Sequence, residues 1–379
     1  MMHLKKRYFI VSLISIFIVS FGYIYKNIPL RTAIYRSFYK QSTYIIFEGD
    51  TIYSFGYFGV RKQVLENNGN LRLLAENDSF CHNCFVGHLI GRSGVIKGDY
   101  LYVATRSYLG GRWKSNSKGY QKGMLLIMCK SNLRILKRIE VDYSMIEAKI
   151  YKNVLVVSGL QGFDIYDIGI PLSPQLTHSF RTNKLWEFQG CEFINADTAL
   201  YVAFARWSDG LSIYNITNPS KVCPVANLAI QDTLLPQGLQ TFCLKYIPPY
   251  LYSSLAPVPA TIGTEKDRRG IIVYDLSDIN NITREVVLIP RTDWYQSKIG
   301  DPQPSHIGLY EENMYTNFGE KGGAVFDVKD AVVKYKGIIK IPEVNKILPL
   351  HITEKGILLV GDYKDGSITS FNLNKYGSI

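Results

Sequence analysis

Three stretches of the chain repeat one pattern: Gly162–Leu176 (GFDIYDIGIPLSPQL), Gly210–Val225 (GLSIYNITNPSKVCPV) and Gly270–Asp278 (GIIVYDLSD). Each begins with glycine, continues as an alternating run rich in Ile and Tyr, and then reaches Asp or Asn. Alternation with a period of two is typical of a β-strand, and an Asp or Asn after the run indicates a turn. The repeated pattern therefore predicts an all-β protein built from similar units.

The same pattern extends along the chain from about residue 43 to its end. A strand ending in residues such as Leu-Tyr-Val is followed by a polar loop and a second strand. We find seven such pairs, whose two strands begin at Asp50 and Asn70, Gly98 and Gly123, Lys152 and Gly162, Asp197 and Gly210, Pro249 and Gly270, Glu312 and Gly323, and Lys355 and Gly366. The repeat of about 50 residues leaves room for four short strands in each unit.

A single unit of this kind cannot bury both of its faces, so the units must stack against one another. Seven units in a ring leave no exposed sheet edge. The sequence therefore predicts a seven-bladed β-propeller over residues 43–379. We expect the acid or amide after the second strand to form turns rather than to act in catalysis, at Asp167, Asn215, Asp275, Asp327 and Asn372.

The three stretches quoted first resemble the LVIVD repeat of bacterial and archaeal surface proteins. That repeat runs from Gly through an alternating strand to Asp and a Ser/Thr-Asp/Asn-Pro turn. The resemblance covers the third to fifth units well, the last two loosely and the first two poorly, and Asn215 replaces the usual Asp. It implies a β-propeller at the cell envelope and no common catalytic motif.

The N-terminus predicts a membrane segment. Lys5-Lys6-Arg7 precedes Tyr8–Tyr25, which has no formal charge and as a helix is about 27 Å long, close to the thickness of a bilayer core. We expect residues 1–26 to be an uncleaved anchor, with the propeller exported to the periplasmic or extracellular side. Ser20-Phe21-Gly22 leaves a cleaved signal peptide and a secreted protein as the alternative.

The formal charge of +11 does not indicate a nucleic-acid partner. Residues 1–47 hold seven Lys or Arg and no acid, and the rest of the chain holds 36 basic against 32 acidic residues. Because basic and acidic residues nearly balance after residue 47, this part of the chain lacks the excess positive charge typical of a protein that binds a polyanion. Residues 27–42 are expected to be a linker. Because the last unit ends a few residues after its second strand, we expect some part of Thr32–Phe47 to supply its missing edge strand.

Cysteines give a limited signal. Cys81 and Cys84, in Cys-His-Asn-Cys with His88 nearby, are consistent with a local disulfide, with free thiols or with part of a zinc site. A zinc site is the least favoured, because no second pair of metal-binding residues lies close enough to complete it; we favour the disulfide, with free thiols next. No metal or other cofactor is predicted.

The innermost strand of each blade should precede its Leu-Tyr-Val strand and line the central channel. Polar residues recur at these positions: His88, Glu147, Gln189, Gln237, His306 and His351. They are either solvated channel residues or the lining of a ligand pocket at one channel mouth. Three insertions rich in basic and aromatic residues, 107–121, 257–269 and 291–305, are either surface loops or partner contacts.

Standard motifs of hydrolases, zinc proteases, nucleotide-binding loops and dinucleotide-binding enzymes are absent from the sequence. The leading hypothesis is a membrane-tethered propeller that recognises a protein partner or an envelope glycan. The alternative is a polysaccharide hydrolase or lyase with its site at the channel mouth, and a third is a purely structural envelope component. Two facing carboxylates about 5–10 Å apart in the channel mouth would favour the enzyme.

Overall fold

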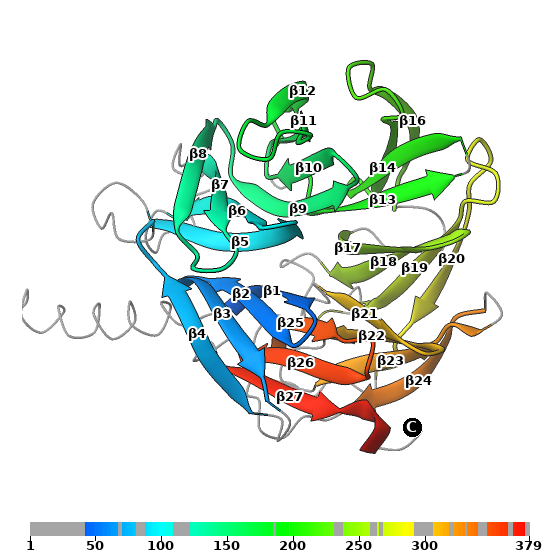
Figure 1. Ribbon diagram of the computed structural model, residues 1–379. Helices are drawn as coiled ribbons and strands as arrows, with labels where there is room; N and C mark the ends of the chain where they lie inside the picture. The colour runs from blue at the N-terminus through cyan, green and yellow to red at the C-terminus, as the bar shows by residue number, and fades with distance from the viewer. Residues whose placement is uncertain are drawn as a thin grey trace, which may run out of the picture.

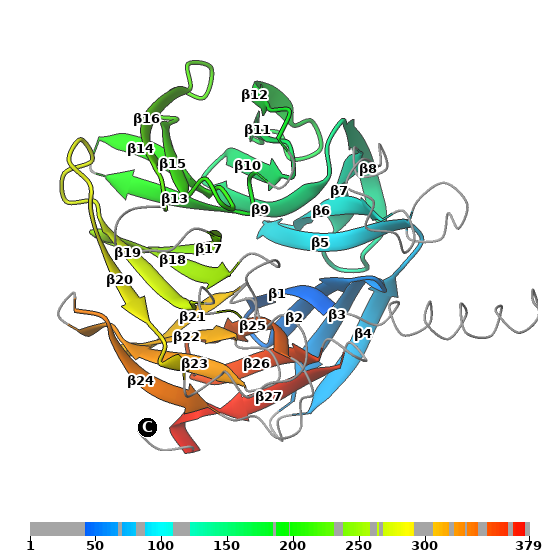
Figure 2. The same ribbon diagram turned by 180° about the vertical axis from the view of Figure 1, so that it is seen from behind.

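The alternating stretches form short antiparallel strands arranged as seven sheets (Figures 1 and 2). The structure is a computed structural model. It describes residues 42–66, 70–80, 88–108, 122–184, 187–196, 198–230, 238–257, 264, 268–291, 306–317, 322–329, 332–339, 347–362 and 367–375.

Each sheet is one blade, and six blades have four described strands. The first three blades contain β1 Ser42–Glu48, β2 Thr51–Gly56, β3 Gly59–Leu65, β4 Leu71–Asn77; β5 His88–Lys97, β6 Tyr100–Tyr108, β7 Gly123–Cys129, β8 Ile135–Val141; β9 Met145–Tyr151, β10 Val154–Gly159, β11 Gly162–Asp167 and β12 Gln175–Arg181. The next two contain β13 Gly190–Ala196, β14 Ala199–Ala205, β15 Leu211–Asn215, β16 Cys223–Leu228; β17 Leu239–Ile247, β18 Tyr250–Pro257, β19 Gly270–Asp275 and β20 Thr283–Leu288. The last two contain β21 Ile307–Tyr310, β22 Asn313–Asn317, β23 Gly323–Asp327, β24 Lys334–Ile339; β25 Ile347–Ile352, β26 Ile357–Asp362 and β27 Ile368–Asn372, followed by a 3₁₀ turn, η5 Leu373–Lys375.

The seven blades form a closed ring. The first strand of each blade contacts the first strand of the next, from β1 through β5, β9, β13, β17, β21 and β25 back to β1. In both views the blue first blade lies beside the red last blade. The predicted all-β, seven-bladed propeller is therefore confirmed.

Packing between neighbouring blades forms the core. The second and third strands of a blade are buried on both faces, as in β10 and β19, because each blade is covered on both sides. Ile213 of the fourth blade belongs to one cluster with Leu251 and Tyr274 of the fifth. Each such side chain contributes on the order of 1.5–3 kcal/mol when fully buried, which explains why the units stack.

The residues expected to form turns do so. A side-chain oxygen of each accepts a hydrogen bond, at 2.8–3.0 Å, from the backbone N–H two residues later. The five acceptors are Asp167, Asn215, Asp275, Asp327 and Asn372. These side chains satisfy backbone donors where the chain leaves the third strand. One strand assignment was wrong: Leu71–Leu74 belong to the outermost strand β4, and the third strand of the first blade is Gly59–Leu65. The run GVRKQVL alternates less clearly between apolar and polar residues, so the sequence pattern did not reveal it as a strand.

Ser42–Phe47, the described part of the expected closing segment, lies in β1, the innermost strand of the first blade. Closure among the described residues comes from packing: Ile45 and Ile52 of the first blade form a cluster with Leu359 of the last. Residues 32–41 lie outside the described residues. So does the apolar run 8–25, and within the described part of the chain no helix is long and apolar enough to cross a bilayer.

The two ends of the ring differ. We call the end at which the innermost strands begin the mouth face, and the other end the opposite face. Since successive strands are antiparallel, connections between second and third strands, and between blades, leave from the mouth face. The three longest connections, after β6, β18 and β20, all join strand ends at this face. At the opposite face, the turns between first and second strands are short, as at Gly98-Asp99 between β5 and β6.

Candidate functional site

Bulges near the mouth face distort the innermost strands. In β1, β5, β9, β17 and β25 the pairing with the second strand shifts register, so extra residues stand on the innermost strand. In β1, β5 and β9 the extra residues are Thr43, Arg92 and Ile146, and in β17 Phe242 and Cys243 together lie opposite the single Ser254 of β18. A bulge bends the strand and redirects a side chain, and bulges are common beside functional sites.

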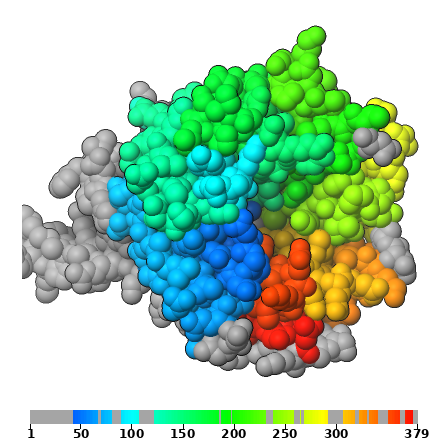
Figure 3. All heavy atoms as spheres, in the orientation of Figure 1, coloured from blue at the N-terminus to red at the C-terminus, as the bar shows by residue number. Residues whose placement is uncertain are grey.

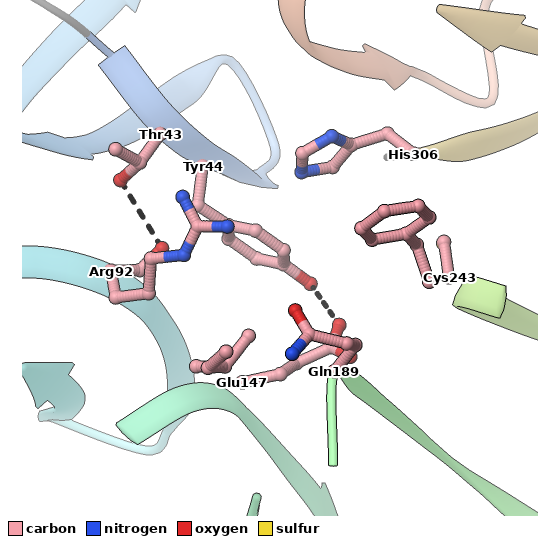
Figure 4. Close-up of a pocket in the computed structure, with 9 residues that line it drawn as sticks. Thr43, Tyr44, Arg92, Glu147, Gln189, Cys243 and His306 are labelled. Atoms are coloured by element: carbon pink, nitrogen blue, oxygen red, sulfur yellow. Dashed lines mark hydrogen bonds between the residues drawn. The ribbon is translucent and has the colours of Figure 1, made fainter. Parts of the chain in front are cut away.

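The bulge residues line a cavity in the central channel (Figure 4). Its described lining is Thr43, Tyr44, Arg92, Ile146, Glu147, Gln189, Phe242, Cys243 and His306. The space left for the centres of water-sized molecules is about 40 Å³, enough for a few waters or one small polar group. Figure 3 shows the hollow at the centre of the ring, between the first, last and middle blades.

A hydrogen bond crosses the channel inside this site. The Tyr44 hydroxyl of the first blade donates to Glu147 Oε1 of the third blade at 3.2 Å. The other oxygen, Glu147 Oε2, accepts the backbone N–H of Cys191 in the fourth blade at 2.9 Å. Burial raises the pKa of Glu147, while Lys149 and the Cys191 amide oppose part of that shift. Both oxygens of this buried acid are thus held in place.

Lys149 balances two acids. Its ammonium lies 3.6 Å from Glu147 Oε1 and 3.1 Å from Glu192 Oε2. Burial alone lowers the pKa of Lys149, but Glu192, Tyr44 and Glu147 outweigh burial and hold the pKa well above its usual value. Lys149 is therefore charged, and its charge offsets those of its two acidic neighbours.

Two histidines in the channel are neutral. Burial, together with the cations Arg92 and Lys149 and with His351, lowers the pKa of His306 to about 3. Burial, Lys245 and Lys149 lower the pKa of His351 to about 4. His306 stacks against Tyr44 with ring centroids 5.5 Å apart, and His351 lies 6.3 Å from the ring of Phe47. Each imidazole therefore offers one N–H donor and one acceptor at neutral pH.

The structure brings three of the six predicted channel residues into the cavity: Glu147, Gln189 and His306. His351 lies in β25 and is not part of the described lining. His88 begins β5, but its side chain lies outside the described residues, as does the whole of Gln237. The polarity pattern missed Thr43, Tyr44, Arg92, Ile146, Phe242 and Cys243, because it does not reveal a bulge.

Other predicted features fall partly outside the described residues. Cys81 and Cys84 lie there, so their disulfide stays a prediction, and most of each of the three insertions lies there too. In the described part of the chain, no group of three or more His, Cys, Asp or Glu could hold a metal ion. Cys243 is a poor nucleophile, since burial raises the pKa of its thiol to about 12.

Comparison with known proteins shows the fold and nothing further. No family model and no curated protein matches the sequence. The crystal structure of the WD40 β-propeller domain of Doa1 is similar, with a TM-score of 0.55, 11% identity, and 89% of this chain and 94% of that chain covered. The crystal structure of the Myceliophteria thermophila Cps50 (Swd1) β-propeller domain is also similar. Its TM-score is 0.55 at 10% identity, and the match covers 88% of this chain and 97% of that chain. The resemblance to the LVIVD repeat stays a prediction.

Proposed function

We propose that this chain is a membrane-tethered β-propeller that recognises a protein partner or an envelope glycan at its mouth face. One observation carries the proposal: the polar cavity opens among innermost strands at the face from which the longest connections leave. Propellers present loops from several blades around one channel mouth, so one ligand can contact many of them. The two propeller domains similar to this chain support the fold on which this arrangement rests.

The geometry gives less support to a polysaccharide hydrolase or lyase. Within the described lining, Glu147 is the single carboxylate, and both of its oxygens are engaged. The second nearby acid, Glu192, pairs with Lys149 and does not line the cavity. A glycosidase needs one carboxyl to protonate the leaving group and another to act on the sugar. A binding role therefore fits this site better.

The tether rests on the uncharged run 8–25 and its basic flank at Lys5–Arg7. Membranes that contain the full chain should keep it after an alkaline carbonate wash, because a spanning helix resists extraction. A variant carrying Ile16→Arg and Val19→Arg places charges in the bilayer core and should be released. Mass spectrometry of the N-terminus decides between the retained anchor and the cleaved signal peptide.

Recognition at the mouth face is tested by affinity capture with the full chain from solubilised source envelopes. Replacing residues 109–121 with a Gly-Ser segment of equal length should abolish enrichment of the partner. The matched control, Ile170→Ser with Leu172→Ser, alters exposed residues in the connection between β11 and β12, at the opposite face, and should capture normally. Equal capture by both variants, or no partner enriched over an unrelated tethered protein, would refute the proposal.

A further inference from the structure

The cavity combines donors from three different blades. Arg92 comes from β5 of the second blade, Gln189 directly precedes β13 of the fourth, and His306 directly precedes β21 of the sixth. Figure 4 shows all three side chains directed toward the space beside the Tyr44 ring. Arginine carries a fixed positive charge and N–H donors in a planar fork that matches a carboxylate.

Arg92 is held in this position by the strand itself. It is the extra residue of the β5 bulge, because Gly91 pairs with Thr105 and Ser93 with Ala104. The Thr43 hydroxyl donates to the Gly91 carbonyl at 2.7 Å and fixes this part of the bulge against the first blade. The bulge therefore places a guanidinium in a cavity that regular pairing would not direct it to.

The two carboxylate oxygens in the described lining are already engaged. Glu147 accepts from Tyr44 and from the Cys191 amide, and Lys149 lies beside it. Burial lowers the pKa of His306 most, and the cations Arg92 and Lys149 lower it further. A ligand group that brings acceptor oxygens and negative charge complements such a site.

We infer that the cavity binds one carboxylate group of the recognised ligand, with Arg92 as the charged donor and Gln189 and His306 as neutral donors. The inference rests on the proposed recognition function and names the chemistry that this function reads. The space of about 40 Å³ left for the centres of water-sized molecules suits one such group. The carboxylate can come from an acidic glycan or from an acidic side chain of a protein.

Calorimetric titration of the full chain in detergent micelles separates these two sources. The probes are tetragalacturonate and tetraglutamate, with maltotetraose and tetraglutamine as their uncharged counterparts. We expect one acidic probe to bind and its uncharged counterpart not to bind, and the acid that binds identifies the source. If neither acidic probe binds, or if the uncharged counterpart binds equally well, the inference is wrong.

Variants test the sign of the charge. Arg92→Gln should weaken binding of the acidic probe about 10- to 100-fold, as expected when a charged hydrogen bond is lost. Arg92→Lys should recover part of the loss, and Arg134→Gln in an exposed turn of the opposite face is the matched control. A cationic ligand would reverse the effect of Arg92→Gln.

Two outcomes keep this inference separate from the proposed function. If envelope capture depends on residues 109–121 but Arg92→Gln changes neither capture nor probe binding, recognition stands and the carboxylate site is refuted. If capture fails altogether while the acidic probe binds through Arg92, the carboxylate site stands and the proposed partner recognition is refuted. Circular dichroism of each variant confirms that lost binding does not reflect unfolding.

Discussion

Glu147 connects three blades through two oxygen atoms. Its own strand belongs to the third blade, Tyr44 reaches it from the first, and the Cys191 amide from the fourth. Lys149 supplies the compensating charge from two residues along the same strand. A buried acid is tolerated when its lone pairs are satisfied and a cation is close, and this one meets both conditions.

Replacing Tyr44 with Phe should lower the free energy of unfolding by about 1–2 kcal/mol, since it removes a hydrogen bond to a buried carboxylate. Urea unfolding followed by circular dichroism measures the change. Tyr100→Phe in β6 is the matched control, because its hydroxyl makes no recorded hydrogen bond to another described residue. Equal stability of Tyr44→Phe and wild type would show that the cross-channel bond contributes nothing.

His306 should make stability depend on pH. Its pKa is lowered to about 3 in the folded protein by burial and by nearby cations, against about 6.5 in the unfolded chain. The unfolded chain therefore takes up a proton first, so stability is fully present above pH 6.5 and falls as the pH is lowered toward 3. Glu147, whose pKa is raised, acts in the opposite direction.

The variant His306→Gln should show a flatter loss of stability between pH 6.5 and 4 than wild type, as measured by the urea midpoint at each pH. Comparing the two proteins isolates the histidine, because Glu147 is present in both. Parallel curves for wild type and variant would contradict a neutral, partly buried His306 in the channel.

At the scale of the strand, bulges decide what the channel contains. Regular pairing would alternate side chains between the two faces of the blade, and one extra residue resets that alternation. In β17 the bulge at Phe242 and Cys243 lies against the start of β13. A Cβ added at Gly190 would sit 2.3 Å from the Phe242 carbonyl oxygen and 3.2 Å from Glu147 Oε2. Glycine is required there because backbone approaches backbone.

Gly190→Ala should therefore destabilise the protein by about 1–3 kcal/mol, the cost of forcing extra volume into a packed contact. Thermal or urea unfolding measures it. The matched control is Gly169→Ala in an exposed turn, where the nearest atom to the added Cβ is a side-chain oxygen 3.2 Å away. If Gly190→Ala is no more destabilising than the control, the backbone contact between the fourth and fifth blades is not rigid.

For the whole molecule, the remaining structural question is the outer edge of the last blade. Among the described strands β27 has one neighbour, β26, so its outer side has no described partner. β27 runs from the mouth face to the opposite face, and an antiparallel partner would return to the mouth face. β1 begins at that face. We therefore keep the expectation that residues before β1 supply the missing edge of the last sheet.

Replacing residues 27–41 with a Gly-Ser segment of the same length tests this closing role and preserves the tether. We expect a clear drop in the thermal unfolding midpoint, because an edge strand would lose its side chains and its order. The Gly-Ser replacement of residues 109–121, a connection within the second blade, is the control. A melting curve unchanged by the 27–41 replacement would leave these residues as a simple linker.

Local sequence patterns predicted most of the strands, the seven units and the turn-forming residues. These features depend on local periodicity and on side chains that bond to their own backbone two residues later, as Asp275 does. Glu147, Gln189 and His306 could be predicted as channel residues, since each lies in or directly before the first strand of its blade. Tertiary structure alone decided the rest of the site. Arg92 and Cys243 reach the cavity because pairing across strands and closure of the ring create bulges, and local alternation does not encode that register.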